Sequence, residues 1–545
     1  MAKLHTSFIG PPTSVSKLDQ DLDRYISDSS NENYDELLKT EDTWPVFYNL
    51  TDLRAALLSW YDIAPNAEVM AMGAGIGSLT GLLCEKAGRV AVVEQSMFRA
   101  RTIAKRYNET ENLDIYVGEL TDLHIVKKFD LIIAIDILPR IADGSQSPVP
   151  YIKYLEELRS YLTLDGKILL AMDNRFGLKY FCGARNPYTE EPFGELSGAQ
   201  PIGHLFSREE ISFIVKEAGF PYVKFYYPLP DFRLPTVVYT DNILPGNDIG
   251  DKFFPYDHAS DTRVLQESEL YLDIIDNGAF PFMANSFLIE CSREDNLCTV
   301  DQATIASDRG RKESVVTSIS AETGTVIKQP VFKAAKDTLA LQAGYLDTLR
   351  ERGLDVIDAK LDNGKLQMPY YPEAQKLSDW FAQTLPKDKD RVLSVFDRLW
   401  AAILQSSPPA PDKDNVLLKK LGSSFDWGVI LKRAYVGMVP SNILYMDSRL
   451  VFLNQEYVRT NYPAKYPMFR AVYYSYSDLE NVVSLEELKT RYGLDSVWTL
   501  FMAEEQEFIA SIRHYDVYHQ LYAWGNMDDN RMVKNRQILK IIGNE

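Results

Sequence analysis

The stretch VMAMGAGIGSLTG, residues 69–81, decides the fold, because an apolar run there meets three glycines at alternate positions. Gly73, Gly75 and Gly77 can take backbone angles that other residues resist, and without side chains they let a ligand touch the backbone. Their spacing is typical of a buried strand that turns tightly into a helix. The stretch therefore predicts a nucleotide-type site at the end of a strand.

Strands and helices alternate around this stretch. Uniformly apolar strands are predicted at EVMAMG (68–73), RVAVVEQ (89–95), LDIYVGE (113–119), FDLIIAIDI (129–137) and KILLAMDN (167–174). Helices are predicted at 52–64, from about 77, at 97–108 and at 151–163. This alternation indicates an α/β domain with a parallel sheet covered on both faces. Ligands of such sheets bind beyond the C-terminal strand ends, near the point where the strand order reverses.

A carboxylate ends the second predicted strand. Glu94 follows Gly77 by seventeen residues, where an acidic residue can accept both hydroxyls of a ribose. The alternative is a solvated carboxylate at a strand end. The dinucleotide fingerprint requires a third small residue that packs the helix on the sheet, but Ser78 stands there and the glycine comes one residue early. The pattern therefore fits S-adenosylmethionine better than a nicotinamide dinucleotide.

Residues 45–295, from the segment WPVFYNLTDLRAALLSW (44–60) onward, resemble class I S-adenosylmethionine-dependent methyltransferases. Three segments resemble one bacterial group of these enzymes, which is associated with lipopolysaccharide, capsule-type and other surface-glycan synthesis. They are AMDNRFGLKYFCGARNPYTEEPFG (171–194), LFSREEI (205–211) and FYYPLPDFRLP (225–235). The resemblance implies a Rossmann-like methyltransferase domain over 51–295, after an N-terminal extension over 1–50. It also implies S-adenosylmethionine as cofactor and a sugar or glycan as acceptor.

The residues expected to bind the cofactor follow the predicted strands. They are Gly73, Ala74, Gly75, Gly77, Glu94, Glu119 and Asp136. In the family, position 71 is usually acidic and helps to hold the amino group of the cofactor's methionine part, but this chain has Ala71. The loss of one charge-assisted contact would weaken binding by roughly 1.5–3 kcal/mol, about ten- to a hundredfold, without abolishing it.

Methyl transfer to a hydroxyl needs a positioned acceptor and a base. Asp136 and His204 are the candidate catalytic bases, and a helix-capping Asp and a surface His are the alternatives. The resemblance implies that residues 174–204 form a lid or acceptor-binding insertion after the fifth strand. Its candidate substrate contacts are Asn174, Arg175, Tyr180 and Tyr188. Its aromatic residues would stack on sugar faces or, alternatively, form a small satellite core.

The chain turns polar around 296–312, which predicts a domain boundary. Two strands (313–330), a helix (332–352), two more strands (355–371) and a mostly helical stretch to 420 are predicted after it. This order resembles the small lobe of a protein-kinase-like fold followed by its helical lobe. A kinase-like α+β domain is therefore expected over 313–483; the alternative is a helical domain with a small sheet.

The residues of this second half argue against kinase activity. Lys328 matches the strand lysine that would hold nucleotide phosphates, but Ala343 stands where its helix glutamate is aligned. The segment GMVPSNILYMDSRLVFLNQEYV (437–458) resembles the catalytic loop and metal-binding strand of a kinase. The residues at its key positions are Gly437, Asn442 and Asn454. Only the loop asparagine is kept; the catalytic and metal-binding aspartates are replaced by Gly437 and Asn454. Phosphoryl transfer relies on both carboxylates, so a degenerate, non-catalytic site is predicted.

The length, charge and cysteine content of the chain limit its domain number, partners and location. Its 545 residues require at least two domains, and a net charge of −19 argues against nucleic acid as a partner. The four cysteines have neither disulfide-framework nor zinc spacing, so free thiols and no metal site are expected. The N-terminus lacks the apolar core of a signal peptide, and the longest apolar run, 129–138, is too short for a bilayer. A cytoplasmic protein without direct membrane insertion is predicted.

The last segment, 484–545, is predicted to be helical, with an apolar stripe for core packing or for a partner. Three functions remain open. The first is a methyltransferase acting on a surface-glycan sugar, whose kinase-like half positions the acceptor or recruits a glycosyltransferase or assembly-complex protein. The second is a pseudoenzyme scaffold, because both halves lack an acid at a cofactor position. The third, an NAD(P)-dependent sugar oxidoreductase, is disfavoured by Ser78.

Overall fold

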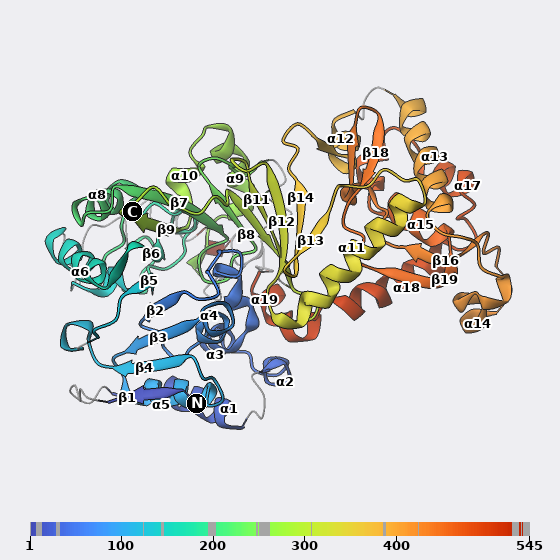
Figure 1. Ribbon diagram of the computed structural model, residues 1–545. Helices are drawn as coiled ribbons and strands as arrows, with labels where there is room; N and C mark the ends of the chain where they lie inside the picture. Colours follow the sequence, from blue (N-terminus) through green and yellow to red (C-terminus); the bar gives the residue numbers. More distant parts are fainter. Residues whose placement is uncertain are drawn as a thin grey trace. The chain divides into compact units, whose positions relative to one another are not determined.

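The computed structural model describes residues 2–6, 14–28, 33–123, 125–142, 147–194, 203–246, 249, 262–306, 308–384, 388–422, 425–525, 534–535 and 537. The chain divides into two compact units. The first contains Met1–Asp308, Val316–Ser318 and Tyr515–Glu545, and the second contains Arg309–Val315 and Ile319–His514. Both combine helices and strands, so the protein is a mixed α/β protein (Figure 1).

Five parallel strands form the centre of the first unit. In spatial order they are β4 (Leu113–Val117), β3 (Arg89–Glu94), β2 (Glu68–Met72), β5 (Phe129–Ile135) and β6 (Leu162–Asp173). Their apolar side chains are buried, as expected for strands of a parallel sheet. The predicted parallel strands are confirmed, with ends within a few residues of the prediction except at the start of β6.

The strand order reverses at β2. From β2 the chain passes through α4 (Thr80–Lys86) to β3 and through α5 (Met97–Arg106) to β4, moving steadily away to one side. It then returns to form β5 on the other side of β2, and α6 (Val149–Ser160) leads on to β6. The C-terminal ends of β2 and β5 therefore border the position where open α/β sheets bind ligands.

Antiparallel strands extend this sheet beyond β6, so the sheet is mixed rather than wholly parallel. They are β9 (Ser286–Ser292), β7 (Tyr222–Leu229), β8 (Val237–Thr240) and β10 (Gln302–Ile305). The helices between them are α7 (Leu178–Phe181), α8 (Arg208–Glu217), α9 (Glu267–Asp276) and α10 (Phe280–Met283). One large apolar cluster joins both parts of the sheet, with members such as Ile132, Leu170 and Phe287.

The N-terminal extension is built into the first unit. Its strand β1 (Lys3–His5) pairs in parallel with β4 and lies beside it in Figure 1. The helices α1 (Lys17–Asp28), α2 (Asp35–Leu38) and α3 (Trp44–Leu50) share an apolar cluster with α19 (Tyr515–Gly525), near the C-terminus. Ile76 of the glycine loop belongs to the same cluster. The two ends of the chain thus help to support the loop.

The helix predicted over 52–64 is wrong in type. Residues Asp52–Leu57 form a 3-10 helix, η1, and no regular helix continues to 64. Ala55, Ala56, Leu57, Leu58 and Trp60 are all buried. The apolar spacing that suggested an α-helix reflects burial of nearly every side chain rather than a single apolar face.

The second unit has an apolar core of its own. β12 (Thr325–Pro330) pairs with β14 (Lys365–Pro369), and β14 pairs with β13 (Lys360–Asp362). The preceding strand, β11 (Val315–Ser320), is divided between the two units. The helix α11 (Lys336–Glu351) follows β12 and contacts β12 and β14. This order of strands and helix is the predicted one, while the kinase-like relationship itself stays a prediction.

The remaining elements of the second unit are mostly helical. The small sheets consist of β15 (Gln375–Lys376), β17 (Ile443–Met446) and β18 (Arg449–Phe452), and of β16 (Ile430–Tyr435) and β19 (Val458–Pro463). The helices are α12 (Leu377–Thr384), α13 (Lys389–Gln405), α14 (Val416–Leu421), α15 (Lys465–Tyr473), α16 (Tyr476–Leu479), α17 (Leu485–Arg491) and α18 (Trp498–Ile512). Buried Val497, Phe501 and Phe508 place the predicted C-terminal stripe in the core. Within the described part of the chain, no helix combines the length and apolarity that a bilayer crossing requires.

Candidate cofactor site

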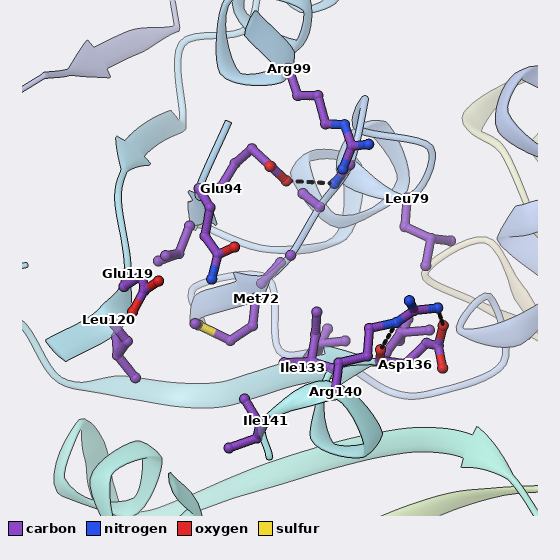
Figure 2. Close-up of a pocket in the computed structure, with 18 of the residues that line it drawn as sticks. Met72, Leu79, Glu94, Arg99, Glu119, Leu120, Ile133, Asp136, Arg140 and Ile141 are labelled. Atoms are coloured by element: carbon purple, nitrogen blue, oxygen red, sulfur yellow. Dashed lines mark hydrogen bonds and ion pairs between the residues drawn. The ribbon is translucent and has the colours of Figure 1, made fainter. Parts of the chain in front are cut away.

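A cavity of about 920 Å³ lies at the C-terminal ends of β2, β3, β4 and β5 (Figure 2). Each strand places a predicted residue in its lining: Gly73 follows β2, Glu94 ends β3, Glu119 follows β4 and Asp136 follows β5. Ala74 and Gly75 line it as well. The volume is within the range usual for small-molecule and cofactor sites, and the position is the reversal point of the sheet.

The three glycines have different tasks. All have positive φ angles, +61° at Gly73, +59° at Gly75 and +84° at Gly77. A Cβ atom would lie 2.2 Å from Ile137 at Gly73 and 2.9 Å from Tyr107 at Gly77, but it would meet nothing within 4 Å at Gly75. The Tyr107 ring excludes a side chain at Gly77, which is not among the described residues that line the cavity, whereas a side chain at Gly73 would have to displace the end of Ile137. Gly75 presents bare backbone to the cavity.

Glu94 is a buried carboxylate with capacity left for a ligand. Its Oε2 accepts a hydrogen bond from the Gly75 amide and its Oε1 accepts one from the Ser96 amide, both at 3.0 Å. The residue is 5% exposed, so the alternative of a solvated strand-end acid is wrong. Burial raises the pKa of Glu94, although the two amides and the charge of Arg99 oppose the shift. Each carboxylate oxygen can accept two hydrogen bonds, so each oxygen keeps one place.

Asp136 is held by two neighbours at the mouth of β5. Its Oδ2 pairs with Arg140 at 2.8 Å, and its Oδ1 accepts a hydrogen bond from the Tyr188 hydroxyl at 3.1 Å. Burial raises the pKa of Tyr188, so its phenol stays protonated and donates. The Arg140 guanidinium also lies 5.1 Å from the Tyr188 ring centre. Each oxygen of Asp136 thus has one side-chain partner, so an acceptor hydroxyl can bind in the remaining place or in place of Tyr188.

His204 is not among the described residues that line the cavity. The centre of its ring lies 4.6 Å from that of Phe206 and 5.9 Å from that of Tyr151. Its Nε2 lies 3.9 Å from the carboxylate of Glu210. Burial lowers the pKa of His204, which favours the neutral ring. The structure therefore does not bring the two candidate bases together in this cavity.

The other predicted acceptor residues are mainly structural. The Asn174 side-chain amide donates to the carbonyl groups of Phe282 at 2.8 Å and Ala284 at 2.7 Å, and it is fully buried. Arg175 lies 3.8 Å from Glu210. Tyr180 packs in a small apolar cluster with Ala184 and Leu205, which matches the satellite-core alternative. Of these four predicted contacts, Tyr188 is the one that reaches Asp136; residues 195–202 of the expected lid lie outside the described residues.

Several polar residues of the lining were not predicted from the sequence, and Tyr48 and Arg54 are two of them. Tyr48 in α3 and Arg54 in η1 both line the cavity. The Arg54 guanidinium lies 4.2 Å from the Tyr48 ring centre and donates to the Arg233 carbonyl at 2.5 Å. A signal was present, because a single arginine interrupts the apolar run LRAALLSW. A buried arginine in such a run needs a partner, and that requirement could have pointed to the site.

A compact ionic cluster lies next to Arg54. Asp173, at the end of β6, pairs with Lys179 and, at 2.7 Å, with Arg233. Asp231 pairs with the same two cations, at 3.1 Å and 2.6 Å. Both aspartates are fully buried. Two acids and two bases balance one another, so this cluster is complete without a ligand.

The degenerate site predicted in the second unit is also brought together. The ammonium group of Lys328 donates to Glu456 at 2.7 Å, Asn454 at 3.1 Å and Gln342 at 3.2 Å. The second carboxylate oxygen of Glu456 pairs with Arg309 at 2.7 Å. Burial alone would raise the pKa of Glu456, but the two cations outweigh it and lower the pKa to about 2.

The structure corrects one alignment at this site. The helix residue that faces Lys328 is Gln342 rather than Ala343, a difference of one position on α11. Asn454 donates to the side-chain oxygen of Asn442 at 3.4 Å, and the Asn442 amide donates to the Gly437 carbonyl at 3.1 Å. The residues predicted from the motif are therefore neighbours, but they bond to one another.

Comparisons with known proteins add structural matches only. Neither a family model nor a curated protein matches the chain. Similar solved structures include a Haloferax volcanii methyltransferase candidate bound to a methyltransferase activator (14% identity, 52% of this chain, 100% of that chain, TM-score 0.30). Another is an S-adenosylmethionine-dependent methyltransferase from Thermotoga maritima (14%, 48%, 98%, 0.28). A third is magnesium protoporphyrin IX methyltransferase from Synechocystis with bound S-adenosylhomocysteine (18%, 37%, 85%, 0.26). Because these TM-scores do not exceed 0.30, any assignment of function depends on the site itself.

Proposed function

We propose that the first unit is an S-adenosylmethionine-dependent methyltransferase whose acceptor is a sugar of a surface glycan. One observation carries the proposal: the buried Glu94 carboxylate at the reversal point of the sheet. The amides of Gly75 and Ser96 fix its orientation and leave one acceptor place on each oxygen. The two adjacent hydroxyls of a ribose supply two donors side by side, and a strand-end acid is the usual partner for them.

The cavity separates a nucleoside end from a reacting end. In Figure 2, Glu94 and Glu119 lie on one side of Met72, and the Asp136–Arg140 pair lies on the other. When bound, the cofactor supplies a methyl group that is already activated as a sulfonium. The protein would then hold the ribose at Glu94 and align an acceptor near Asp136, which is mainly a task of proximity and orientation.

The resemblance to surface-glycan methyltransferases supports a sugar hydroxyl as the acceptor. A hydroxyl has to lose a proton on methylation, and Asp136 is the cavity carboxylate that we assign to accept it. For this, the acceptor hydroxyl would replace the Tyr188 hydroxyl at Oδ1, while Arg140 keeps Oδ2 in place. Tyr188 is then available to contact the sugar.

The second unit would serve as a binding module rather than as a kinase. Lys328 has its three ammonium donors occupied by side chains of the protein itself. We assign this unit the role of positioning the glycan or recruiting another protein of glycan assembly, such as a glycosyltransferase.

Titration calorimetry with S-adenosylmethionine and S-adenosylhomocysteine tests the proposal. Wild-type protein should bind both, and Glu94→Ala should weaken binding by about ten- to a hundredfold, because charge-assisted hydrogen bonds to the ribose are lost. Glu111→Ala, which changes an exposed acid outside the cavity lining, is the matched control and should bind as the wild type does. Equal binding by wild type and Glu94→Ala would contradict the proposed site.

A pseudoenzyme scaffold is the second candidate function, and Ala71 is the observation that favours it. Ala71 lines the cavity but offers no charge to the ligand. If the site has lost its cofactor, the wild type will bind neither compound, and Ala71→Glu will restore binding. Methyl transfer from labelled S-adenosylmethionine to a glycan extract by wild type, but not by Glu94→Ala, would exclude this candidate.

A further inference from the structure

Arg54 is a buried cation that lines the cavity. It is 4% exposed, and its one hydrogen bond within the described part of the chain is the one from Nη1 to the Arg233 carbonyl. Its Nε is buried with no hydrogen-bond partner among the described residues. An arginine has five N–H donors and remains charged in proteins, so most of the bonding capacity of this group is unused.

No acidic side chain of the described residues forms an ion pair with Arg54. The aspartates whose charges reach it, Asp231 and Asp136, are already paired, the first with Lys179 and Arg233 and the second with Arg140. Tyr48 does not supply a charge either, since burial raises the pKa of its phenol. A buried charge without a partner is costly, so the cavity next to Arg54 is prepared for an anion.

The other arginines of the cavity differ from Arg54. Arg99 pairs with Asp19 at 2.8 Å and Arg140 pairs with Asp136 at 2.8 Å. Ala71, which is 7% exposed, lines the same cavity and contributes only a methyl group. Among the described residues, the lining thus offers a buried cation without an ion-pair partner, while position 71 offers no anion to a ligand's ammonium group.

We propose that Arg54 forms a carboxylate subsite for the tail of an adenosyl ligand, and that this subsite does not require the ammonium group that a methionine tail also carries. The inference rests on the proposed function, because it assumes that Glu94 holds the nucleoside. The pocket then selects a ligand tail by the negative charge of its carboxylate. A desamino tail, which keeps the carboxylate alone, suits it as well as the zwitterionic tail does.

A series of four ligands tests this on the wild-type protein. The ligands are S-adenosylhomocysteine, its desamino analogue, its decarboxylated analogue and 5′-methylthioadenosine, which has neither tail group. The desamino analogue should bind within about threefold of S-adenosylhomocysteine. The decarboxylated analogue and 5′-methylthioadenosine should each bind about ten- to a hundredfold more weakly, because they lose the charge-assisted bonds to the guanidinium.

Two variants sharpen the test. Arg54→Met keeps an apolar stem without the charge, and it should remove the difference between the desamino analogue and 5′-methylthioadenosine. Lys153→Met is the control, since Lys153 is an exposed cation of the same lining; it should preserve that difference. Ala71→Asp should strengthen binding of the decarboxylated analogue and weaken binding of the desamino analogue.

The outcomes separate the two levels of the proposal. If all four ligands bind equally and depend on Glu94, the nucleoside site stands and the carboxylate subsite is wrong. The subsite is also wrong if the decarboxylated analogue binds better than the desamino analogue. If none of the four binds, the proposed function fails and this inference fails with it. Since the ligand series needs no substitution, these conclusions hold even if Arg54→Met does not fold.

Discussion

Glu94 in the first unit and Lys328 in the second are both buried charged groups at positions where related motifs hold a nucleotide-type ligand, but they differ in what surrounds them. Glu94 keeps an acceptor place on each oxygen, and Arg54 in the same cavity has no acidic partner among the described residues. Lys328 is 3% exposed and donates to Glu456, Asn454 and Gln342. In the first unit, charged groups with unused hydrogen-bonding capacity line a cavity. In the second unit, the charged groups use their capacity on one another. The state of the partners, rather than the motif, distinguishes a site prepared for a ligand from one that serves the fold.

The largest effect is expected at the closed site. Glu456→Gln leaves Lys328 and Arg309 without their shared carboxylate and should lower the free energy of unfolding of the second unit by about 3–5 kcal/mol. Urea unfolding followed by tryptophan fluorescence measures this. Combining it with Lys328→Met should recover most of the loss. A loss below about 1 kcal/mol would show that the pair behaves as a surface pair and that the site is not closed.

The same pair predicts a dependence on pH. The pKa of Glu456 is lowered in the folded state from 4.5 to about 2. The stabilisation that its ionised carboxylate gives to the fold is therefore fully present above pH 4.5. It should be lost as the pH falls from 4.5 towards 2, because the unfolded chain then takes up the proton first. Wild type and Glu456→Gln should therefore converge in stability at the acidic end of this range, and a constant difference would contradict the assignment.

A smaller effect is expected at the open site. Glu94→Gln should weaken binding of S-adenosylhomocysteine by about tenfold or more, because an amide accepts through one oxygen only. The substitution removes a buried charge, but it also leaves the Gly75 or Ser96 amide facing an N–H donor, so the stability of the free protein should change little. Calorimetry and thermal unfolding measure the two quantities. A large loss of stability with unchanged affinity would indicate a structural role instead.

The pH dependence of binding belongs to the same carboxylate. Affinity of the wild type should fall as the pH is lowered through the raised pKa of Glu94, because the protonated form loses acceptor capacity. This fall should begin at a higher pH than for an ordinary glutamate, and it should be absent in Glu94→Gln.

Two substitutions in the glycine loop should differ in their effect on stability. Gly75→Ala meets no atom within 4 Å, so its cost should be limited to the positive φ angle, about 1–2 kcal/mol, and its main effect should be on ligand affinity. Gly73→Ala meets the end of the Ile137 side chain at 2.2 Å and should destabilise the protein more. Thermal unfolding of both variants ranks them, and the reverse order would contradict the assigned roles.

The smallest shift is expected for ATP with magnesium. Wild-type protein should show no thermal shift, because the three donors of Lys328 and the carboxylate of Glu456 are occupied by side chains of the protein itself. A saturable stabilisation by ATP and magnesium would show that the second site opens and would remove the contrast between the two units.

Local sequence patterns predicted the framework of the first unit well. Apolar runs separated by helices indicate parallel strands wherever the fold is regular, and the alternate glycines mark the turn after β2. Glu94 was identifiable because its distance from Gly77 is fixed by one strand, one helix and the next strand. These features depend on short-range geometry, which the sequence records directly.

Long-range features could not be read in the same way. The role of Arg54 becomes visible only in the folded chain, where it lines the cavity without an ion-pair partner among the described residues, and the 3-10 helix around it replaces the predicted α-helix. Asn174 resembles an acceptor contact in sequence, but its amide is used by backbone carbonyls more than a hundred residues away. Gln342 was missed by one position, which on a helix rotates a side chain by about 100°.

A crystal structure of the full chain grown with S-adenosylhomocysteine would show the contact between the ribose and Glu94 itself. Both ribose hydroxyls should lie within hydrogen-bonding distance of the Glu94 carboxylate, in the cavity between β2 and β5. A ligand bound with its ribose away from Glu94, or a saturated crystal whose cavity is closed by the protein's own side chains, would contradict the proposed site.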